Sequence, residues 1–434
     1  MASWRGALET YREPRLLAIL LMGFSSGLPL PLTVGTLSFW LAEVGISRTA
    51  IGLFALIGIS YNFKFVWSPL IDRLPIPLLT RRLGRRRSWA LAIQAPLALA
   101  ILALGFTDPR SAPLATVLVA VVVAFLSASQ DIVIDAYRIE LLTPEEQGAG
   151  AAATQWGYRF GLLASGAGVL YAQAFTGWSV AYALMALLMA VGMVTVWLTP
   201  EPTAPELPPL AGHDRGARLA SWLRVAVVAP LADILARPHW AAILGFIVLY
   251  KFGDALAGVM ANPLYVALHF TGPEVASISK VFGVFATLAG VAMGGIAVAR
   301  YGLYPSLLIC GVLQTGSNLM YVALTLAGHD LTMLTASIAI ENITGGMGSA
   351  AFVAYLSGLC NPSFTATQYA LLSSLAAVGR TVLSASGGWL ADKLDWVPFF
   401  LVTTAAGAPG LLLLLWLMGR GVSPAAPAGV ATER

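Results

Sequence analysis

The apolar stretch 113–141 contains four polar residues whose spacing can support chemistry. Ser127, Asp131, Asp135 and Arg138 follow one another at intervals of four, four and three residues, which places them on one face of a helix. At the rise of an α-helix, Asp131 lies about 16 Å from the end of this stretch. A carboxyl group at that depth can bind a proton and release it when a cation approaches. We therefore predict proton exchange at Asp131 or Asp135; a buried pair of Asp135 with Arg138 that only fixes helix packing is the alternative.

A later stretch, residues 331–359, carries a similar acid, and each half of the chain carries an arginine in the stretch that follows. Glu341 precedes Asn342, while Arg159 and Arg380 lie at comparable depth in their own stretches. Glu341 is a third candidate for proton exchange, because an ionisable group within a membrane is costly to insert. A planar guanidinium binds a carboxylate through two hydrogen bonds, so we predict that these arginines, with Asn342, bind an acidic substrate. Permanent pairing of the arginines with the acids is the alternative.

Further polar and aromatic side chains in these stretches are candidates for substrate binding. Aromatic faces beside hydrogen-bonding groups suit sugar rings, although most aromatic residues in membranes serve packing or anchor the chain at the interface. Mutual neutralisation of Lys251 and Asp254 is an equally good interpretation of that pair. The candidates are Tyr61, Asn62, Lys64, Trp156, Tyr158, Lys251, Asp254, Gln368 and Tyr369.

The sequence contains no motif of an enzyme. There is no Gly-x4-Gly-Lys-Ser/Thr phosphate-binding loop, so direct use of ATP is not expected. The four histidines lie in loops or at the ends of apolar stretches without the spacing of metal ligands, and two isolated cysteines make no disulfide framework. We therefore predict that the protein is not an enzyme and has neither a metal site nor a cofactor.

The elements that position these residues follow from the composition. Of the 434 residues, 58% are hydrophobic and 11% are charged, whereas about 25% are charged in soluble proteins. This excludes a soluble domain, and the scatter of basic residues in short segments argues against nucleic-acid binding. A membrane-spanning helix needs about 20 apolar residues, and helices are the default spanning structure. We predict an all-α integral membrane protein with twelve transmembrane helices, at about residues 16–41, 50–71, 88–107, 113–141, 149–175, 179–198, 240–268, 274–299, 304–327, 331–359, 367–391 and 396–418.

The distribution of arginine and lysine predicts the orientation of the spans. With the N-terminus in the cytoplasm, most of these residues fall in cytoplasmic segments, and the outer loops hold only Arg48, Arg110 and Lys393. Cytoplasmic loops are rich in basic residues. We therefore expect both termini in the cytoplasm.

The two halves of the chain resemble each other. Arg159, followed after four residues by Ala-Ser-Gly, matches Arg380, and Thr154-Gln-Trp matches Thr367-Gln-Tyr. A duplicated six-span unit predicts the major facilitator fold, in which two six-helix halves face a central cavity. The expected divisions are an N-terminal bundle at 1–198, a cytoplasmic linker at 199–239, a C-terminal bundle at 240–420 and a cytoplasmic tail at 421–434.

The linker could form a surface helix at 219–237. Trp222 and Leu223 would then be buried in the membrane surface, with Arg218 and Arg224 in water and Pro230 interrupting the helix. A solvated linker is the alternative.

The segment after the second span is rich in charge. Asp72 and Arg73 are followed by Arg85, Arg86 and Arg87. We predict that Asp72, Arg73, Arg85 and Arg86 help to close the cytoplasmic side of the protein.

Three segments carry a resemblance to a known family: residues 26–30 (Ser-Gly-Leu-Pro-Leu), residues 51–73 and residues 127–138. They resemble the AmpG-type muropeptide permeases of the major facilitator superfamily. The resemblance implies transport of N-acetylglucosaminyl-1,6-anhydro-N-acetylmuramic acid, with or without its peptide, from periplasm to cytoplasm with protons. It also implies roles for Gln130, Asp131 and Asp135.

The resulting hypothesis is a proton-coupled importer of anhydromuropeptides in the bacterial inner membrane, working by alternating access as a monomer among membrane lipids. Two alternatives remain: a transporter of another anionic solute, such as a coenzyme A ester, and a non-transporting assembly factor for pigment-binding complexes. Acids and arginines at mid-depth argue against the assembly factor, because a scaffold gains little from their insertion cost.

Overall fold

The computed structural model describes residues 13–46, 57, 59–203, 221–384 and 386–422, and within them every regular element is a helix. Predictions that concern residues 1–12, 47–56, 58, 204–220, 385 and 423–434 lie outside this part. The N-terminal elements are α2 Pro14–Gly27, α3 Pro29–Thr33, α4 Gly35–Glu43, α6 Ile59–Asn62, η3 Lys64–Val66, α7 Ser68–Arg73, α8 Leu79–Leu83, α9 Arg85–Gly105, α10 Pro113–Leu141, α11 Gln147–Leu163, η4 Ala164–Gly168, α12 Val169–Thr176 and α13 Trp178–Leu198. After η5 Arg224–Val228 and α15 Ala229–Leu235 come α16 Trp240–Leu249, α17 Phe252–Ala267, α18 Gly272–Val275, η6 Ala276–Phe282, α19 Gly283–Tyr301, α20 Leu303–Ser317, α21 Leu319–Ala327, α22 Leu331–Gly358, η7 Pro362–Phe364, α23 Thr365–Ser384, α24 Gly387–Lys393 and α25 Trp396–Gly419.

Within the described residues, nine helices are long and apolar enough to cross a membrane. They correspond to all of the predicted spans except the second, fifth and tenth. The fifth and tenth are also long helices, at residues 147–176 and 331–358, and they are less apolar because they carry many glycine and polar residues. The first part of the second span lies outside the described residues, so the count of twelve stays a prediction there.

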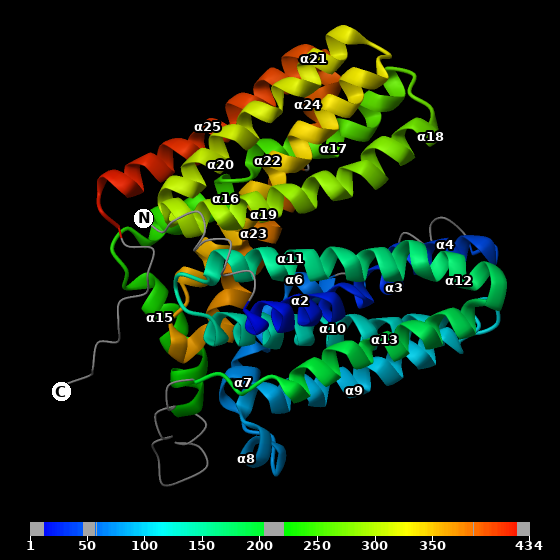
Figure 1. Ribbon diagram of the computed structural model, residues 1–434, viewed down its shortest axis with the longest axis vertical. Coiled ribbons are helices and arrows are strands. Elements are labelled where there is room, and N and C mark those ends of the chain that lie inside the picture. Colours follow the sequence, from blue (N-terminus) through cyan, green and yellow to red (C-terminus); the bar gives the residue numbers. More distant parts are fainter. Residues whose placement is uncertain (1–12, 47–56, 58, 204–220, 385, 423–434) are drawn as a thin grey trace.

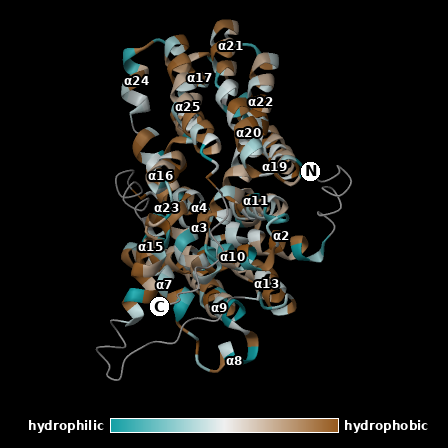
Figure 2. Cartoon of the chain, turned by 90° about the vertical axis from the view of Figure 1, so that its left-hand side faces the viewer, coloured by the Kyte–Doolittle hydropathy of each residue, from teal (hydrophilic) through white to brown (hydrophobic). Residues whose placement is uncertain are grey.

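The helices gather in two bundles (Figure 1). Helices α2–α13 form one bundle and α16–α25 the other; α11 packs against α19 where the bundles meet, and they separate toward the end that carries α12 and α18. Hydrophobic residues dominate the helices, while α8 and α24 include hydrophilic residues (Figure 2). This distribution is that of a protein embedded in lipid.

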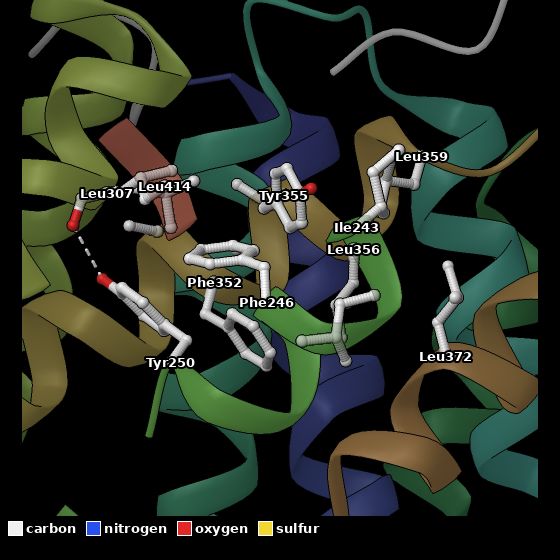
Figure 3. Close-up of a cluster of buried hydrophobic side chains, with 14 of the residues drawn as sticks. Ile243, Phe246, Tyr250, Leu307, Phe352, Tyr355, Leu356, Leu359, Leu372 and Leu414 are labelled. Atoms are coloured by element: carbon white, nitrogen blue, oxygen red, sulfur yellow. Dashed lines mark hydrogen bonds between the residues drawn. The ribbon is translucent and has the colours of Figure 1, made fainter. Parts of the chain in front are cut away.

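The C-terminal bundle has an aromatic core. Phe246 and Tyr250 pack with Phe352 and Tyr355, and the Tyr250 hydroxyl donates to the carbonyl of Leu307 at 2.9 Å (Figure 3). A buried tyrosine needs such a partner for its hydroxyl. This core fixes the start of span seven against spans nine and ten.

Two spans are broken where they carry a lysine. In span two a short 3-10 segment starts at Lys64, after Phe63 leaves the helical conformation with φ −103° and ψ 9°. In span seven α16 ends before Tyr250 and α17 starts after Lys251, which has φ −109° and ψ 17°. Broken helices within a membrane are found where the backbone is buried in protein or lines a cavity. Both breaks therefore point to the centre of the protein.

The matched segment of span five contains a change in helix geometry. The α-helix ends at Leu163, four residues after Arg159, and the chain continues as a π-helical turn, Ala164–Gly168. The matched segment of span eleven includes residue 385, which lies outside the described residues.

The described part of the linker is helical, and Pro230 does not interrupt it. Pro230 lies in the first turn of α15, directly after the π-helical turn η5, where the missing N–H of proline is tolerated. Gln368 of α23 donates to the Pro230 carbonyl at 3.1 Å and to Asp233 at 2.8 Å. Leu223 is 45% exposed. The segment therefore packs on the protein itself, through contacts that the expected membrane-surface helix did not include.

Candidate functional site

A cavity of about 520 Å³ lies between the two bundles. Five predicted site residues with charged side chains line it: Asp131, Asp135, Arg159, Lys251 and Arg380. They come from spans four, five, seven and eleven, so both halves of the chain contribute. Tyr158 and Tyr369, two predicted aromatic residues, complete the predicted part of its wall.

The acidic wall is built by span four. Asp131 accepts a hydrogen bond from the Ser26 hydroxyl of α2. Asp135 lies 3.7 Å from Nζ of Lys64 and 3.9 Å from Nη2 of Arg138. The two carboxyl groups therefore differ: Asp131 has a hydroxyl donor, whereas Asp135 is shared between two cations.

The basic wall comes from both bundles. Arg159 of α11 and Arg380 of α23 are exposed, and both line the cavity. Lys251 is more enclosed, and its Nζ donates to the Ser349 hydroxyl at 2.6 Å. Three cations thus face the same space, and no salt bridge to either arginine is found among the described residues. Two of them present the guanidinium fork that matches a carboxylate.

Several predicted binding residues have other partners instead of lining this cavity. Gln130 is fully buried and donates to the carbonyl of Ser25 at 3.0 Å. Trp156 donates from Nε1 to the carbonyl of Leu288 at 2.8 Å, across the two bundles. The side chain of Asn342 donates to its own helix and accepts from Thr287. These hydrogen bonds serve packing, so the three side chains contribute to a site through the position of the helices; Oε1 of Gln130 is buried without a partner among the described residues.

The remaining predicted residues lie beside the cavity or away from it. Lys64 pairs with Asp135, and Gln368 holds the linker helix, as described above. Tyr61 packs against the core of the N-terminal bundle. Glu341 lies near Tyr321 and Asp254 within the C-terminal bundle. The cavity lining includes none of these, nor Asn62.

The structure adds residues that the sequence did not single out for the site. Thr154 and Gln155 of α11, Ser349 and Phe352 of α22, and Ser373 of α23 line the cavity. Ser373 lies seven residues before Arg380, and such spacing places two residues on one face of a helix. This spacing could have predicted Ser373 as a cavity residue from the sequence. Phe352, in contrast, cannot be told from other core residues in the sequence.

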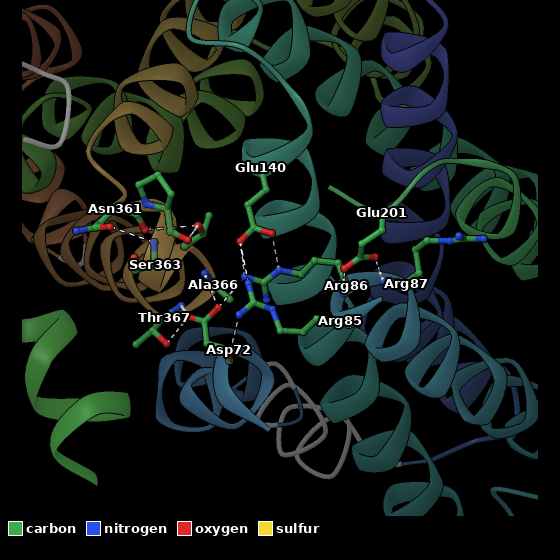
Figure 4. Close-up of polar contacts among 12 residues, drawn as sticks. Asp72, Arg85, Arg86, Arg87, Glu140, Glu201, Asn361, Ser363, Ala366 and Thr367 are labelled. Carbon is green, nitrogen blue, oxygen red and sulfur yellow. Dashed lines mark hydrogen bonds and ion pairs between the residues drawn. The ribbon is translucent and has the colours of Figure 1, made fainter. Parts of the chain in front are cut away.

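A network of charged residues around Asp72 and Arg86 joins the two bundles at one of their ends (Figure 4). This end is here named the Arg86 end. Asp72 is buried and accepts hydrogen bonds from the backbone N–H groups of Ala366 and Thr367, at 3.2 and 2.7 Å, and from the Thr367 hydroxyl at 2.7 Å. These groups begin α23 of the other bundle, where exposed N–H groups favour an anion. Asp72 therefore joins the bundles.

Arg86 holds this network together. Its Nη2 lies 2.7 Å from Asp72 and 2.5 Å from Glu140, and its Nε donates to Glu140 at 2.9 Å. Arg85 donates to the carbonyl of Asp72 at 3.0 Å, so it supports the same turn. Arg73 lies with its guanidinium 5.0 Å from the ring centre of Phe364, again in the other bundle. The four residues predicted for a gate thus meet at one place.

Metal ligands are not gathered anywhere in the described part of the chain: no cluster of three or more histidine, cysteine, aspartate or glutamate side chains occurs there.

The sequence is similar to those of known permeases. It is 44% identical over 410 residues to the anhydromuropeptide permease of Escherichia coli (strain K12), covering 94% of this chain and 80% of that one. It is 34% identical over 411 residues to a putative transporter, AmpG 4, of Rickettsia conorii, covering 94% and 98%. Residues 15–173 also match the family described as acetyl-coenzyme A transporter 1.

Solved structures of low sequence identity share the fold. The human organic anion transporter MFSD10 superposes with a TM-score of 0.65 at 15% identity, covering 95% of this chain and 100% of that one. The major facilitator superfamily proton:xylose symporter XylE superposes with a TM-score of 0.59 at 14% identity, covering 97% of each chain. At this identity the likeness establishes architecture alone, and it is the architecture predicted from the duplicated sequence. The identity to the permeases over nearly the whole chain shows that this protein is an integral membrane protein of the AmpG family of anhydromuropeptide permeases, and the solved structures show that it has the major facilitator fold.

Proposed function

We propose that this protein imports anhydromuropeptides from the periplasm to the cytoplasm across the bacterial inner membrane, with protons, by alternating access between its two bundles. The substrate is N-acetylglucosaminyl-1,6-anhydro-N-acetylmuramic acid, with or without its peptide. The names of the relatives support the substrate class. The Arg86 end faces the cytoplasm, as do both termini, because the basic residues gather there.

The observation that carries the proposal is the composition of the cavity wall. Arg159 and Lys251 face it from opposite bundles, with Arg380 beside them, while Asp131 and Asp135 lie on span four. Cations on both bundles can bind one acidic substrate between them, and the acids provide a place for the coupled proton. Tyr158 and Phe352 supply aromatic faces for sugar rings.

The conformation supports a direction of access. The hydrogen bonds of Asp72 with α23 and of Arg138 with Ser357 join the bundles on the Arg86 side of the cavity. The bundles separate toward the other end (Figure 1). We infer that this is the state closed to the cytoplasm, ready to receive substrate from the periplasm.

A second candidate is a coenzyme A ester, because residues 15–173 match the acetyl-coenzyme A transporter family. Such an ester carries several phosphate charges. The cavity has three cations and two carboxylates, a balance that suits a substrate with one or two acidic groups better. Excess acetyl-coenzyme A should therefore fail to compete with labelled anhydro-disaccharide for uptake; effective competition would favour the second candidate.

The decisive experiment is uptake of labelled anhydro-disaccharide into membrane vesicles, with and without an imposed pH gradient. Asp131→Asn mimics the protonated carboxyl group with little change in volume. It should abolish accumulation against a gradient, keep part of the substrate binding and remove most of the pH dependence of binding, because proton and substrate binding are then no longer linked. An Asp131→Asn protein that still concentrates substrate would exclude Asp131 as the proton carrier, leaving Asp135 or Glu341.

A further inference from the structure

Arg138 lies at the junction between the cavity and the cytoplasmic contact of the two bundles. Its side chain is fully buried. Nη2 donates to the hydroxyl of Ser357 in α22 at 3.0 Å, and the guanidinium carbon lies 5.4 Å from the ring centre of Tyr369 in α23. Span four of the N-terminal bundle is thereby held to two spans of the C-terminal bundle.

The charge of Arg138 is incompletely satisfied. The same Nη2 lies 3.9 Å from Oδ1 of Asp135, and Nε and Nη1 have no hydrogen-bond partner among the described residues. Asp135 is therefore the carboxylate that compensates this buried guanidinium, and it does so at long range. A buried cation that loses its counter-ion is destabilising, because the charge is left without compensation.

Asp135 lines the cavity, so its carboxyl group is reached from that space. The charged and titratable groups around it are Lys64 at 3.7 Å, Arg138, Asp131, Tyr158, Tyr369 and, near Arg138, Cys360. Lys64 belongs to the same bundle as Asp135, and among the described residues its side chain has no hydrogen bond or ion pair with the other bundle. Of the two cations paired with Asp135, Arg138 is the one that reaches the C-terminal bundle.

We propose that Arg138 is a positioning residue that converts neutralisation of Asp135 into opening of the cytoplasmic side. With Asp135 charged, Arg138 is compensated and keeps its contacts with Ser357 and Tyr369. With Asp135 neutral, the buried guanidinium of Arg138 has no compensating anion. Separation of the bundles at this end is then favoured, because it lets water solvate the guanidinium. The inference rests on the proposed function only in that transport requires this opening; the opening itself is measured without substrate.

Cys360 provides a native reporter. Its thiol is buried, one turn of helix from Ser357, and lines a separate cavity of about 600 Å³ between Glu140 and Thr365 at the same end. The experiment measures the rate at which a maleimide labels Cys360 in vesicles that expose the cytoplasmic face, at one fixed pH. A Cys310→Ala background removes the other cysteine.

Asp135→Asn, which mimics the neutral acid, should raise the labelling rate at least about fivefold, the lower end of typical coupling free energies. In an Arg138→Gln background, labelling should be fast already, and adding Asp135→Asn should change it no further. Lys64→Met is the matched control, because it removes the other cation of Asp135 without removing a hydrogen bond or ion pair between the bundles; it should not accelerate labelling. An equal rise from Asp135→Asn with and without Arg138, or no rise in either, would overturn the proposal.

Should Arg138→Gln fail to assemble, Ser357→Ala keeps the guanidinium and removes its acceptor in the other bundle, and the same loss of response to Asp135→Asn is expected. The readout separates the two hypotheses. Absence of anhydromuropeptide uptake with an intact labelling response would refute the substrate and keep the coupling by Arg138. Intact uptake with no labelling response would refute the coupling alone.

Discussion

Span eleven meets the N-terminal bundle through hydrogen bonds to Asp72, whereas span five meets the C-terminal bundle mainly by close packing, with one hydrogen bond from Trp156. On α11, Gly148, Ala152 and Trp156 recur every four residues, and they lie against α19, where Gly148 faces Val298 and Trp156 bonds to Leu288. The matched sequences Thr154-Gln-Trp and Thr367-Gln-Tyr thus serve different contacts. Thr367 binds Asp72, while Thr154 bonds within its own helix to Gly150 at 2.9 Å.

The difference teaches how the closure can be reversed. A contact made of one buried carboxylate and a few donors changes sharply when the bundles shift, because hydrogen bonds depend on distance and angle. A contact made of close-packed small residues depends on shape and permits rolling of one helix on the other. We infer that the Asp72 contact latches the closed state and the α11–α19 contact acts as the pivot.

Asp72→Asn should have the largest effect on this comparison. Removing one partner of a buried ion pair typically costs about 3–5 kcal/mol, and here it leaves Arg86 with Glu140 alone. We expect the rate of uptake to fall at least about tenfold, with a much smaller change in the substrate concentration that gives half-maximal rate. Initial rates of uptake over a range of substrate concentrations measure both.

Thr367→Val is the matched variant for Asp72→Asn. It removes the Thr367 hydroxyl but keeps the two backbone donors to Asp72, so the contact between the bundles should lose about 0.5–1.5 kcal/mol of stabilisation. An unchanged rate in Asp72→Asn would make Asp72 a residue of topology, and the latch would have to lie elsewhere.

Gly148→Ala should have the next largest effect, because it tests shape instead of charge. A Cβ at Gly148 would lie 2.8 Å from Cβ of Val298. Rotation of the Val298 side chain cannot relieve this overlap, because its Cβ is fixed by the backbone. Overpacking of this kind costs about 1–3 kcal/mol, and we expect slower uptake and faster maleimide labelling of Cys360.

Val298→Gly should partly rescue Gly148→Ala, because it removes both Val298 atoms, Cβ and Cγ1, that lie 2.8 Å from the added Cβ. Gly166→Ala in the same span is the control, because no atom lies within 4 Å of the added Cβ. Normal transport by Gly148→Ala would show that the α11–α19 contact is loose, which contradicts its role as a pivot.

The contact that holds the linker helix α15 to the bundle, made by Asp233 with Asn361 and Gln368, should show the smallest effect. Its stability should depend on pH. Burial raises the pKa of Asp233, but hydrogen bonds from Arg237, Asn361 and Gln368 outweigh it and hold the pKa below its ordinary value. A lowered pKa means that the stabilisation is present above about pH 4 and is lost as the pH falls through the folded-state value. Hydrogen exchange of residues 221–237 should therefore accelerate only in acid.

Asp233→Asn should remove that acid dependence and raise exchange modestly at neutral pH, because the side chain is partly exposed and its interactions are partly screened. The same acid profile in wild type and Asp233→Asn would assign the effect to another group. Either result also shows whether the linker helix is held by charge, like the Asp72 contact, or by packing, like the α11–α19 contact.

The sequence predicted those features that follow from periodicity. The spacing of Asp131, Asp135 and Arg138 placed one polar face on span four, and the repeated Arg-x4-Ala-Ser-Gly located two arginines that do face one cavity. Hydropathy was less informative for spans five and ten, because helices that line a cavity or pack through glycine are less apolar than those that face lipid.

Features that depend on contacts between distant residues could not be predicted. Gln130 and Asn342 are polar residues at depth like any other, and only the packing shows that their amides are occupied by neighbouring helices. The breaks at Lys64 and Lys251 have no glycine or proline at the lysine itself to announce them. Capture of Gln368 by the linker depends on a helix more than a hundred residues earlier in the chain.

The placement of Arg159 and Arg380 on opposite bundles also affects how readily the protein changes conformation without bound substrate. Closing the periplasmic side without cargo would bring these two guanidinium groups, with Lys251, into a space with little water, where repulsion between like charges is strong. An acidic cargo removes that barrier. We therefore expect slippage, the return of the empty carrier carrying only protons, to be slow, and neutral sugar analogues to occupy the cavity without being carried.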